Sequence, residues 1–120
     1  MNFVQRVVFK FSCAFKGLHT ALIADNSFKT HIVFLILVTI AGFFFNLNPT
    51  EWAILVFAMG LVIVSELFNT AIEFLVRMFT QEYHELAEKL LDISAGAVLF
   101  SVITALVMAL ILVVPRLLKS

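Results

Sequence analysis

The chain has 120 residues, of which 62% are hydrophobic and 13% charged, and its 8 lysines and arginines balance 8 acidic residues. Soluble domains are about 45–50% apolar and about 25% charged, so this composition excludes an ordinary water-soluble enzyme. The balanced charge gives no reason to expect a nucleic-acid partner. Cys13 is the only cysteine, which excludes an intrachain disulfide and a thiolate metal cluster. We expect one all-α membrane domain over 1–120.

The first 28 residues predict an amphipathic helix that lies in the membrane interface. Apolar side chains recur at helical spacing on one face, polar side chains lie opposite, and Arg6 and Lys10 mark the boundary. Long basic side chains at such a boundary can reach the water. This pattern is typical of a helix that rests on a membrane rather than crosses it.

Three later stretches are apolar and long enough to cross a membrane, which takes about 18 residues or more. The middle stretch is interrupted by only two acids, Glu66 and Glu73. It starts at Asn48, Pro49 and Glu51, a capping side chain, an early proline and a first-turn acid, which are typical of a helix start. The predicted transmembrane helices span 30–48, 51–78 and 92–115.

The basic residues predict the orientation. They gather before the first span and between the second and third, so the N-terminus and the loop 77–92 are expected on the cytoplasmic side. At about 1.5 Å per residue, Glu73 then lies near the cytoplasmic surface and Glu66 roughly two turns inside it. Asp25 and Asp92 flank the first and third spans at the same level. The polar residues are thus expected to converge on the cytoplasmic interface.

Four polar side chains of the middle span share one stripe. At about 100° per residue, Glu66, Asn69, Thr70 and Glu73 point the same way. A charge deep in a bilayer costs about 2.5–3.5 kcal/mol on the insertion scale, so these acids must face protein, a cation or water. Glu73 is shallow enough to bind a divalent metal. Glu66 is deep enough to act as a general base on a lipid hydroxyl.

Each of these residues also has a purely structural interpretation. Glu66 and Asn69 could form hydrogen bonds between helices, Asp25 could cap the first span, and Asp92 could cap the third. His84 could be an ordinary interfacial histidine, whereas His31 is interpreted as structural. The chain has no glycine-rich phosphate-binding loop. Any phosphoryl transfer would therefore use carboxylate-held Mg²⁺ and interfacial polar groups.

The motif Glu66-Leu-Phe-Asn69-Thr-Ala-Ile-Glu73 resembles the prokaryotic diacylglycerol kinase and undecaprenol kinase family. The segments Glu82-Tyr83-His84 and Asp92-Ile-Ser-Ala-Gly96-Ala-Val fit as well, and the resemblance covers about residues 3–115. It implies a homotrimer in the bacterial cytoplasmic membrane, with one interfacial helix and three spans per subunit. It also implies transfer of the γ-phosphoryl group of MgATP to a lipid hydroxyl at the cytoplasmic interface.

The resemblance also implies roles for single residues. Glu66 matches the catalytic base, which also meets the lipid, and Asn69 matches the asparagine that supports this base. Asp25 and Glu73 match the metal and nucleotide ligands, and Arg6 would approach the lipid headgroup. The remaining residues implied at the nucleotide site are Glu82, Tyr83, His84 and Asp92.

Three positions depart from the family pattern: Asp25 replaces a glutamate, Leu91 a lysine and Arg77 an aspartate. These departures leave open a non-catalytic relative that binds nucleotide or lipid. A proton-coupled transporter with Glu66 as carrier is less favoured, because such small transporters need four spans. The stretch 28–31 looks more like undecaprenol kinases than diacylglycerol kinases.

Overall fold

The computed structural model describes residues 1–119, and this part of the chain contains four α-helices and no strand. The helices are α1 (Phe3–Ala24), α2 (Asn26–Phe44), α3 (Pro49–Phe79) and α4 (Glu85–Lys119). All four are long and apolar enough to cross a membrane. The predicted all-α membrane fold is therefore confirmed, while the interfacial position of α1 stays a prediction.

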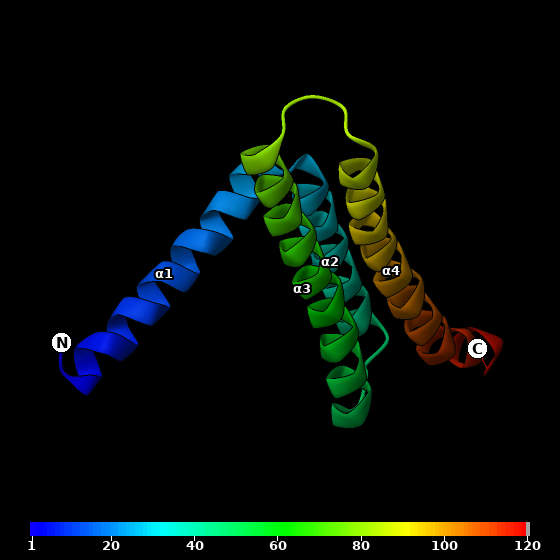
Figure 1. Cartoon of the computed structure of the whole chain (residues 1–120). Coiled ribbons are helices and arrows are strands. Elements are labelled where there is room, and N and C mark those ends of the chain that lie inside the picture. The colour runs from blue at the N-terminus through cyan, green and yellow to red at the C-terminus, as the bar shows by residue number, and fades with distance from the viewer. Residues whose placement is uncertain (120) are drawn as a thin grey trace.

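The helices form a group of three with one arm (Figure 1). α3 makes most of its tertiary contacts with α4, and α2 packs against α3. α1 meets this group only at its C-terminal end, near the buried Ala21, and its N-terminal end points away from the other helices. The polar stripe of α3 is thus enclosed by α2 and α4 and not by most of α1.

The start of α3 follows its sequence signals. The Asn48 side chain accepts a hydrogen bond from the Glu51 amide at 2.9 Å, and the Glu51 side chain accepts one from the Asn48 amide at 3.0 Å. Pro49 occupies the first turn, where its missing N–H has no intrahelical partner to lose. This reciprocal capping box confirms the predicted helix start.

The boundary between the first two helices lies earlier than expected. α1 ends at Ala24, and Asp25 is extended, with φ −125° and ψ 113°. The Asp25 side chain accepts a hydrogen bond from the Ser27 amide at 2.9 Å, which caps α2. The capping interpretation of Asp25 is therefore confirmed, and the predicted helix over 1–28 is too long by one short turn.

α4 starts at Glu85, seven residues before the predicted span 92–115. His84 explains this start, because its Nδ1 atom accepts a hydrogen bond from the Leu86 amide at 3.2 Å. Asp92 lies inside the helix, so its interpretation as a cap is wrong. The helix continues past Pro115, and its C-terminal end turns aside in Figure 1, as expected where proline removes a hydrogen-bond donor.

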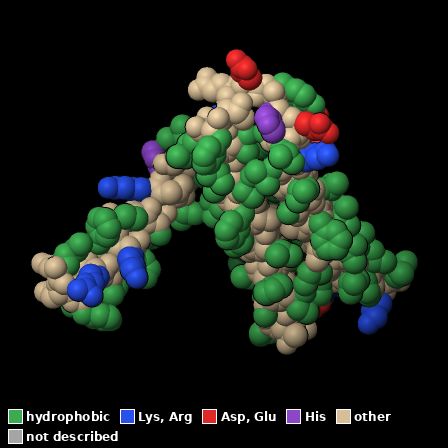
Figure 2. Space-filling model, in the orientation of Figure 1, with side chains coloured by type: hydrophobic (Ala, Val, Ile, Leu, Met, Phe, Trp, Pro, Cys, Tyr) green, Lys and Arg blue, Asp and Glu red, His purple; other side chains and the backbone are tan. Residues whose placement is uncertain are grey.

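The interior of this protein is unusually polar. Within residues 1–119, besides the buried Gly42, five buried residues are apolar and five are polar, the latter being Glu66, Asn69, Thr70, Ser94 and Ser101. Figure 2 shows apolar side chains over the outer faces of the helices, with charged ones along α1, at the α3–α4 loop and near the C-terminal end. An apolar exterior around a polar interior is the arrangement that a bilayer favours.

Candidate active site

The site is built on the C-terminal half of α3, where the helical repeat brings the polar side chains of the stripe to one face. Glu66 is the most enclosed large side chain, with 2% of its surface exposed. Asn69 and Thr70 are buried beside it, whereas Glu73 is half-buried, one turn nearer the helix end. The exposure of the stripe thus rises toward the C-terminal end of α3, while the depth of its residues in a membrane stays a prediction.

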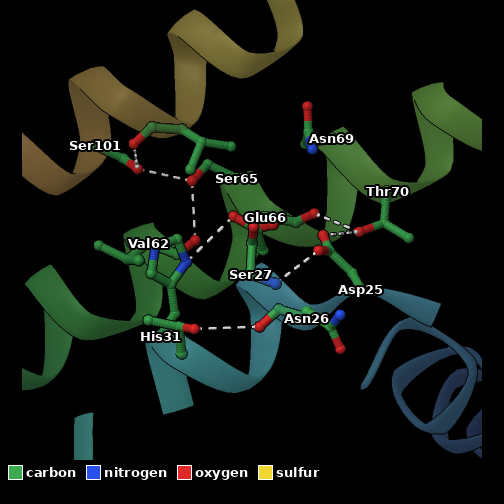
Figure 3. Close-up of polar contacts among 12 residues, drawn as sticks. Asp25, Asn26, Ser27, His31, Val62, Ser65, Glu66, Asn69, Thr70 and Ser101 are labelled. Carbon is green, nitrogen blue, oxygen red and sulfur yellow. Dashed lines mark hydrogen bonds and ion pairs between the residues drawn. The ribbon is translucent and has the colours of Figure 1, made fainter. Parts of the chain in front are cut away.

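Asp25 lies against this stripe, although it comes from the junction of α1 and α2 (Figure 3). The Thr70 hydroxyl donates to Asp25 Oδ2 at 3.2 Å, and it also lies 3.1 Å from the Glu66 carbonyl oxygen. Desolvation raises the pKa of Asp25, but its hydrogen bonds, foremost that with Glu66, outweigh this effect and hold the pKa below its ordinary value. The turn that caps α2 thus brings a second carboxyl group to Glu66.

His31 is the main residue that the sequence reasoning missed. Its Nδ1 atom lies 3.2 Å from Glu66 Oε2 (Figure 3). This buried nitrogen has no well-formed hydrogen bond within the described residues, so the contact is a close polar approach rather than an aligned bond. The one signal in the sequence was a histidine at the start of an apolar span, at the level of the acids.

Asn69 points to the shallow acid. Its Nδ2 atom donates to Glu73 Oε1 at 2.9 Å, and its Oδ1 atom accepts from the Ser94 hydroxyl of α4 at 2.6 Å. The family-implied support of Glu66 by Asn69 therefore differs from the hydrogen bonds seen here, because those of the Asn69 amide go to Glu73 and Ser94. Arg77 Nη2 lies 3.9 Å from the other Glu73 oxygen and its guanidinium stacks 5.0 Å above the Phe74 ring.

The remaining predicted residues divide into two groups. Glu82, Tyr83, His84 and Asp92 all line one open cavity of about 660 Å³ between the ends of α3 and α4. Arg6 is exposed near the free end of α1, which the structure does not bring to the other site residues. Four of the predicted positions thus share one surface, and Arg6 does not.

The described residues contain no group of three or more histidines, cysteines and acids placed to hold a metal ion. Asp25 lies with Glu66, and Glu73 lies with Asn69 and Arg77. Mg²⁺ in phosphoryl-transfer sites usually takes one or two carboxylates and completes its shell with phosphates and water. Carboxylates such as Asp25 and Glu73 fit an ion that arrives with a nucleotide.

The family model described as prokaryotic diacylglycerol kinase matches residues 12–113. The chain belongs to this family. The undecaprenol kinase of Bacillus subtilis is 31% identical over 116 residues, 97% of this chain and 94% of the relative. The diacylglycerol kinase of Escherichia coli K12 is 29% identical over 102 residues, 85% and 84% of the two chains. That of Synechocystis is 34% identical over 110 residues, 91% and 63% of the chains.

Membership of this family confirms the predicted enzyme class, a lipid kinase. Two of the positions at which this lipid kinase departs from the family pattern line the same cavity, Arg77 and Leu91. Arg77 is the one lysine or arginine among the described lining residues, while Lys89 pairs with Glu85 at 3.5 Å. Arg77 thus brings a positive charge to the wall of this cavity from α3.

The cavity wall is ordered by two local contacts. The Tyr83 hydroxyl donates to Glu88 Oε2 at 2.5 Å, and this hydrogen bond raises the pKa of Tyr83. His84 uses Nδ1 to cap α4, which fixes the ring at the rim of the cavity. The loop between α3 and α4 therefore holds two ring side chains, at 83 and 84, in defined positions.

Proposed function

We propose that this lipid kinase transfers the γ-phosphoryl group of ATP, in the presence of Mg²⁺, to the primary hydroxyl of a membrane lipid. The observation that carries the proposal is the stripe from the enclosed Glu66 to the half-exposed Glu73, which ends beside the cavity of the α3–α4 loop. A deep carboxylate suits a lipid hydroxyl, and a shallow one suits a water-soluble nucleotide. We place both at the cytoplasmic surface of the bacterial membrane, in a homotrimer.

Glu66 is the proposed general base. The lipid hydroxyl gives its proton to a Glu66 carboxylate oxygen while its own oxygen forms a bond to the γ-phosphorus, and the bond from that phosphorus to the bridging oxygen of ADP breaks. Burial supports this role because a carboxylate shielded from water interacts more strongly with a nearby proton donor. His31 and Asp25 limit the positions that the carboxyl group can adopt.

The nucleotide is proposed to bind in the cavity lined by Glu82, Tyr83, His84 and Asp92. Arg77, on its wall, would approach the phosphates with a planar cation. Asp25 and Glu73 would hold the Mg²⁺, which offsets phosphate charge when bound. Leu91 carries no charge, so these assignments require the Arg77 guanidinium to contact the phosphates rather than Glu73.

The lipid is proposed to be undecaprenol or diacylglycerol, since relatives named for both alcohols align over most of this chain. An apolar groove of about 340 Å³ runs between α2, α3 and α4 and includes His31 in its lining, next to Glu66. A lipid chain in this groove would bring its terminal hydroxyl toward the base.

A second candidate is a catalytically impaired relative that binds nucleotide or lipid. The observation that favours it is the 3.9 Å approach of Arg77 to Glu73 Oε2, because a guanidinium that pairs with Glu73 competes with a metal ion for the same oxygen. Lysine at position 91, replaced here by Leu91, would not have that conflict.

The deciding experiment is transfer of labelled phosphate from ATP to undecaprenol and to diacylglycerol in parallel mixed micelles with Mg²⁺. We expect Glu66→Gln to lower turnover by about 100-fold or more, since general acid–base catalysis contributes about 10²–10⁴-fold. Glu85→Gln, a change of the same type on an exposed glutamate, is expected to keep full activity. Equal activity of Glu66→Gln and the parent would contradict the assignment, and an inactive but well-folded parent would favour the impaired relative.

A further inference from the structure

A chain of hydrogen bonds crosses from α4 to the shallow acid of α3. Ser94 is 5% exposed, and its hydroxyl donates to Asn69 Oδ1 at 2.6 Å. The other end of the same amide donates from Nδ2 to Glu73 Oε1 at 2.9 Å. In Figure 3 Asn69 stands apart from the dashed contact between Glu66 and His31. This hydrogen-bonded series therefore consists of Ser94, Asn69 and Glu73.

The chemistry of the three groups fixes the direction of this chain. An ionised carboxylate only accepts hydrogen bonds, so the NH₂ end of the Asn69 amide must face Glu73. The carbonyl end then points toward α4, where a buried oxygen needs a donor. Ser94 provides that donor. Because a serine hydroxyl can either donate or accept, Glu73 sets the orientation of the amide, and the Ser94 hydroxyl anchors its carbonyl end to α4.

The consequence appears at Glu73. With Oε1 held by Asn69, the second carboxylate oxygen, Oε2, is left to face the cavity side, where Arg77 Nη2 lies 3.9 Å away. A loosely held Glu73 side chain could rotate to give Arg77 both oxygens. A fixed one leaves Oε2 in a loose ion pair with Arg77, beyond hydrogen-bond length, which a divalent cation can replace.

We infer that Ser94 is a positioning residue of this kinase: by anchoring the Asn69 amide, it holds Glu73 with one carboxylate oxygen, Oε2, only loosely paired with Arg77 and open to the divalent cation that accompanies ATP. This inference rests on the proposed role of Glu73 as a metal ligand. Partners that orient a metal ligand typically cost about 10- to 100-fold in metal affinity or activity when they are removed. Ser94 is thus expected to affect the metal–nucleotide complex rather than the lipid.

The protein contains a matched control for the loss of the Ser94 hydroxyl. Ser101 lies on α4 seven residues after Ser94, about two helical turns, and it is 4% exposed. Its hydroxyl is 2.7 Å from the Ser65 hydroxyl of α3. Ser101→Ala therefore removes the same atom and one contact between the same two helices, but the contact does not lead to Glu73.

The test measures binding of the Mn²⁺ complex of a non-hydrolysable ATP analogue to the full-length kinase in micelles, followed by water-proton relaxation. We expect Ser94→Ala to raise the dissociation constant about 10- to 100-fold. Ser101→Ala should leave the dissociation constant nearly unchanged, because the Ser101 hydroxyl contacts Ser65 and not Asn69. In the transfer assay, Ser94→Ala should raise the KM for MgATP and leave the KM for lipid unchanged. Ser94→Thr, which keeps the hydroxyl, should bind as the parent does.

A second variant covers the case in which Ser94→Ala fails to fold. Ser94→Cys keeps the shape of the side chain but donates only weakly, so it should weaken binding as well. Parent-like binding by either loss variant, or an equal loss in Ser101→Ala, would overturn the role of Ser94. Glu73→Gln distinguishes failure of the Ser94 inference from failure of the proposed role of Glu73. If Glu73→Gln binds the Mn²⁺–nucleotide complex as the parent does, Glu73 is not a metal ligand.

Discussion

At the scale of single residues, the site depends on how one buried carboxyl group is held. Glu66 is 2% exposed and meets His31 from α2 and Asp25 from the α1–α2 junction. Each contact comes from a different segment, so the base is held from several sides rather than by its own helix. His31 is the member of this cluster that also lines the apolar groove.

His31 is therefore expected to position Glu66 in the reaction. His31→Phe keeps a ring but removes the nitrogen that lies 3.2 Å from Glu66 Oε2. We expect this contact, which is poorly aligned here, to tighten into a hydrogen bond in the Michaelis complex. Its loss should lower kcat by about tenfold or more, because a hydrogen bond to a charged group contributes about 1.5–3 kcal/mol. His31→Asn, whose amide can place a donor near the same point, should recover much of the loss. The measurement is kcat for phosphate transfer at saturating ATP and lipid.

Thr30→Val provides the comparison, since Thr30 lines the same groove and its hydroxyl bonds the Asn26 carbonyl of its own helix at 3.3 Å. A loss in Thr30→Val as large as that in His31→Phe would show that the groove, and not the contact with Glu66, is what the substitution disturbs.

At the scale of helices, the close approach of α2 and α3 depends on a small residue. A Cβ atom at Gly42 would lie 2.6 Å from the Trp52 ring, which also packs against Phe43 with ring centroids 4.9 Å apart. Gly42→Ala should therefore lower the free energy of unfolding by about 1–3 kcal/mol, the usual cost of overpacking. Gly60→Ala is the matched control, because nothing lies within 4 Å of its Cβ position.

Thermal unfolding in one detergent, followed by circular dichroism, measures this difference. Gly42→Ala should melt below the parent and Gly60→Ala at or slightly above it, since alanine favours a helix interior over glycine by about 0.8–1.0 kcal/mol. If both variants melt together, Trp52 moves aside without cost, and the contact does not determine how α2 and α3 pack.

The sequence predicts most of this helical arrangement, and the failures have identifiable causes. The capping box at Asn48 was predictable because both partners are standard capping residues three positions apart. The start of α4 was missed because its cap is His84, which is not a usual capping residue. The contact of His31 with Glu66, and that of Ser94 with Asn69, join different helices, and spacing along one helix does not encode such pairs.

At the scale of the whole molecule, the two ends of the helical group differ in chemistry. One end holds the acids, Arg77 and the α3–α4 loop, whereas the other is closed by Arg116, which pairs with Glu51 and donates to the Phe45 carbonyl at 3.1 Å. The half-buried Arg116 at the far end joins α4 to the α2–α3 turn and pairs with the acid there. This asymmetry agrees with a water-exposed reaction at one membrane surface only.

The only cysteine offers a direct test of that orientation. Cys13 is exposed in the middle of α1, so an interfacial α1 on the cytoplasmic side should let a membrane-impermeant maleimide label it in inverted vesicles but not in intact cells. Thr50→Cys in a Cys13→Ser background should show the reverse pattern. Thr50 is exposed at the start of α3, the end away from Glu73 and the α3–α4 loop. Cys13→Ser alone gives the unlabelled baseline. Protection of Cys13 from both sides would mean that α1, which is long and apolar enough, crosses the membrane instead.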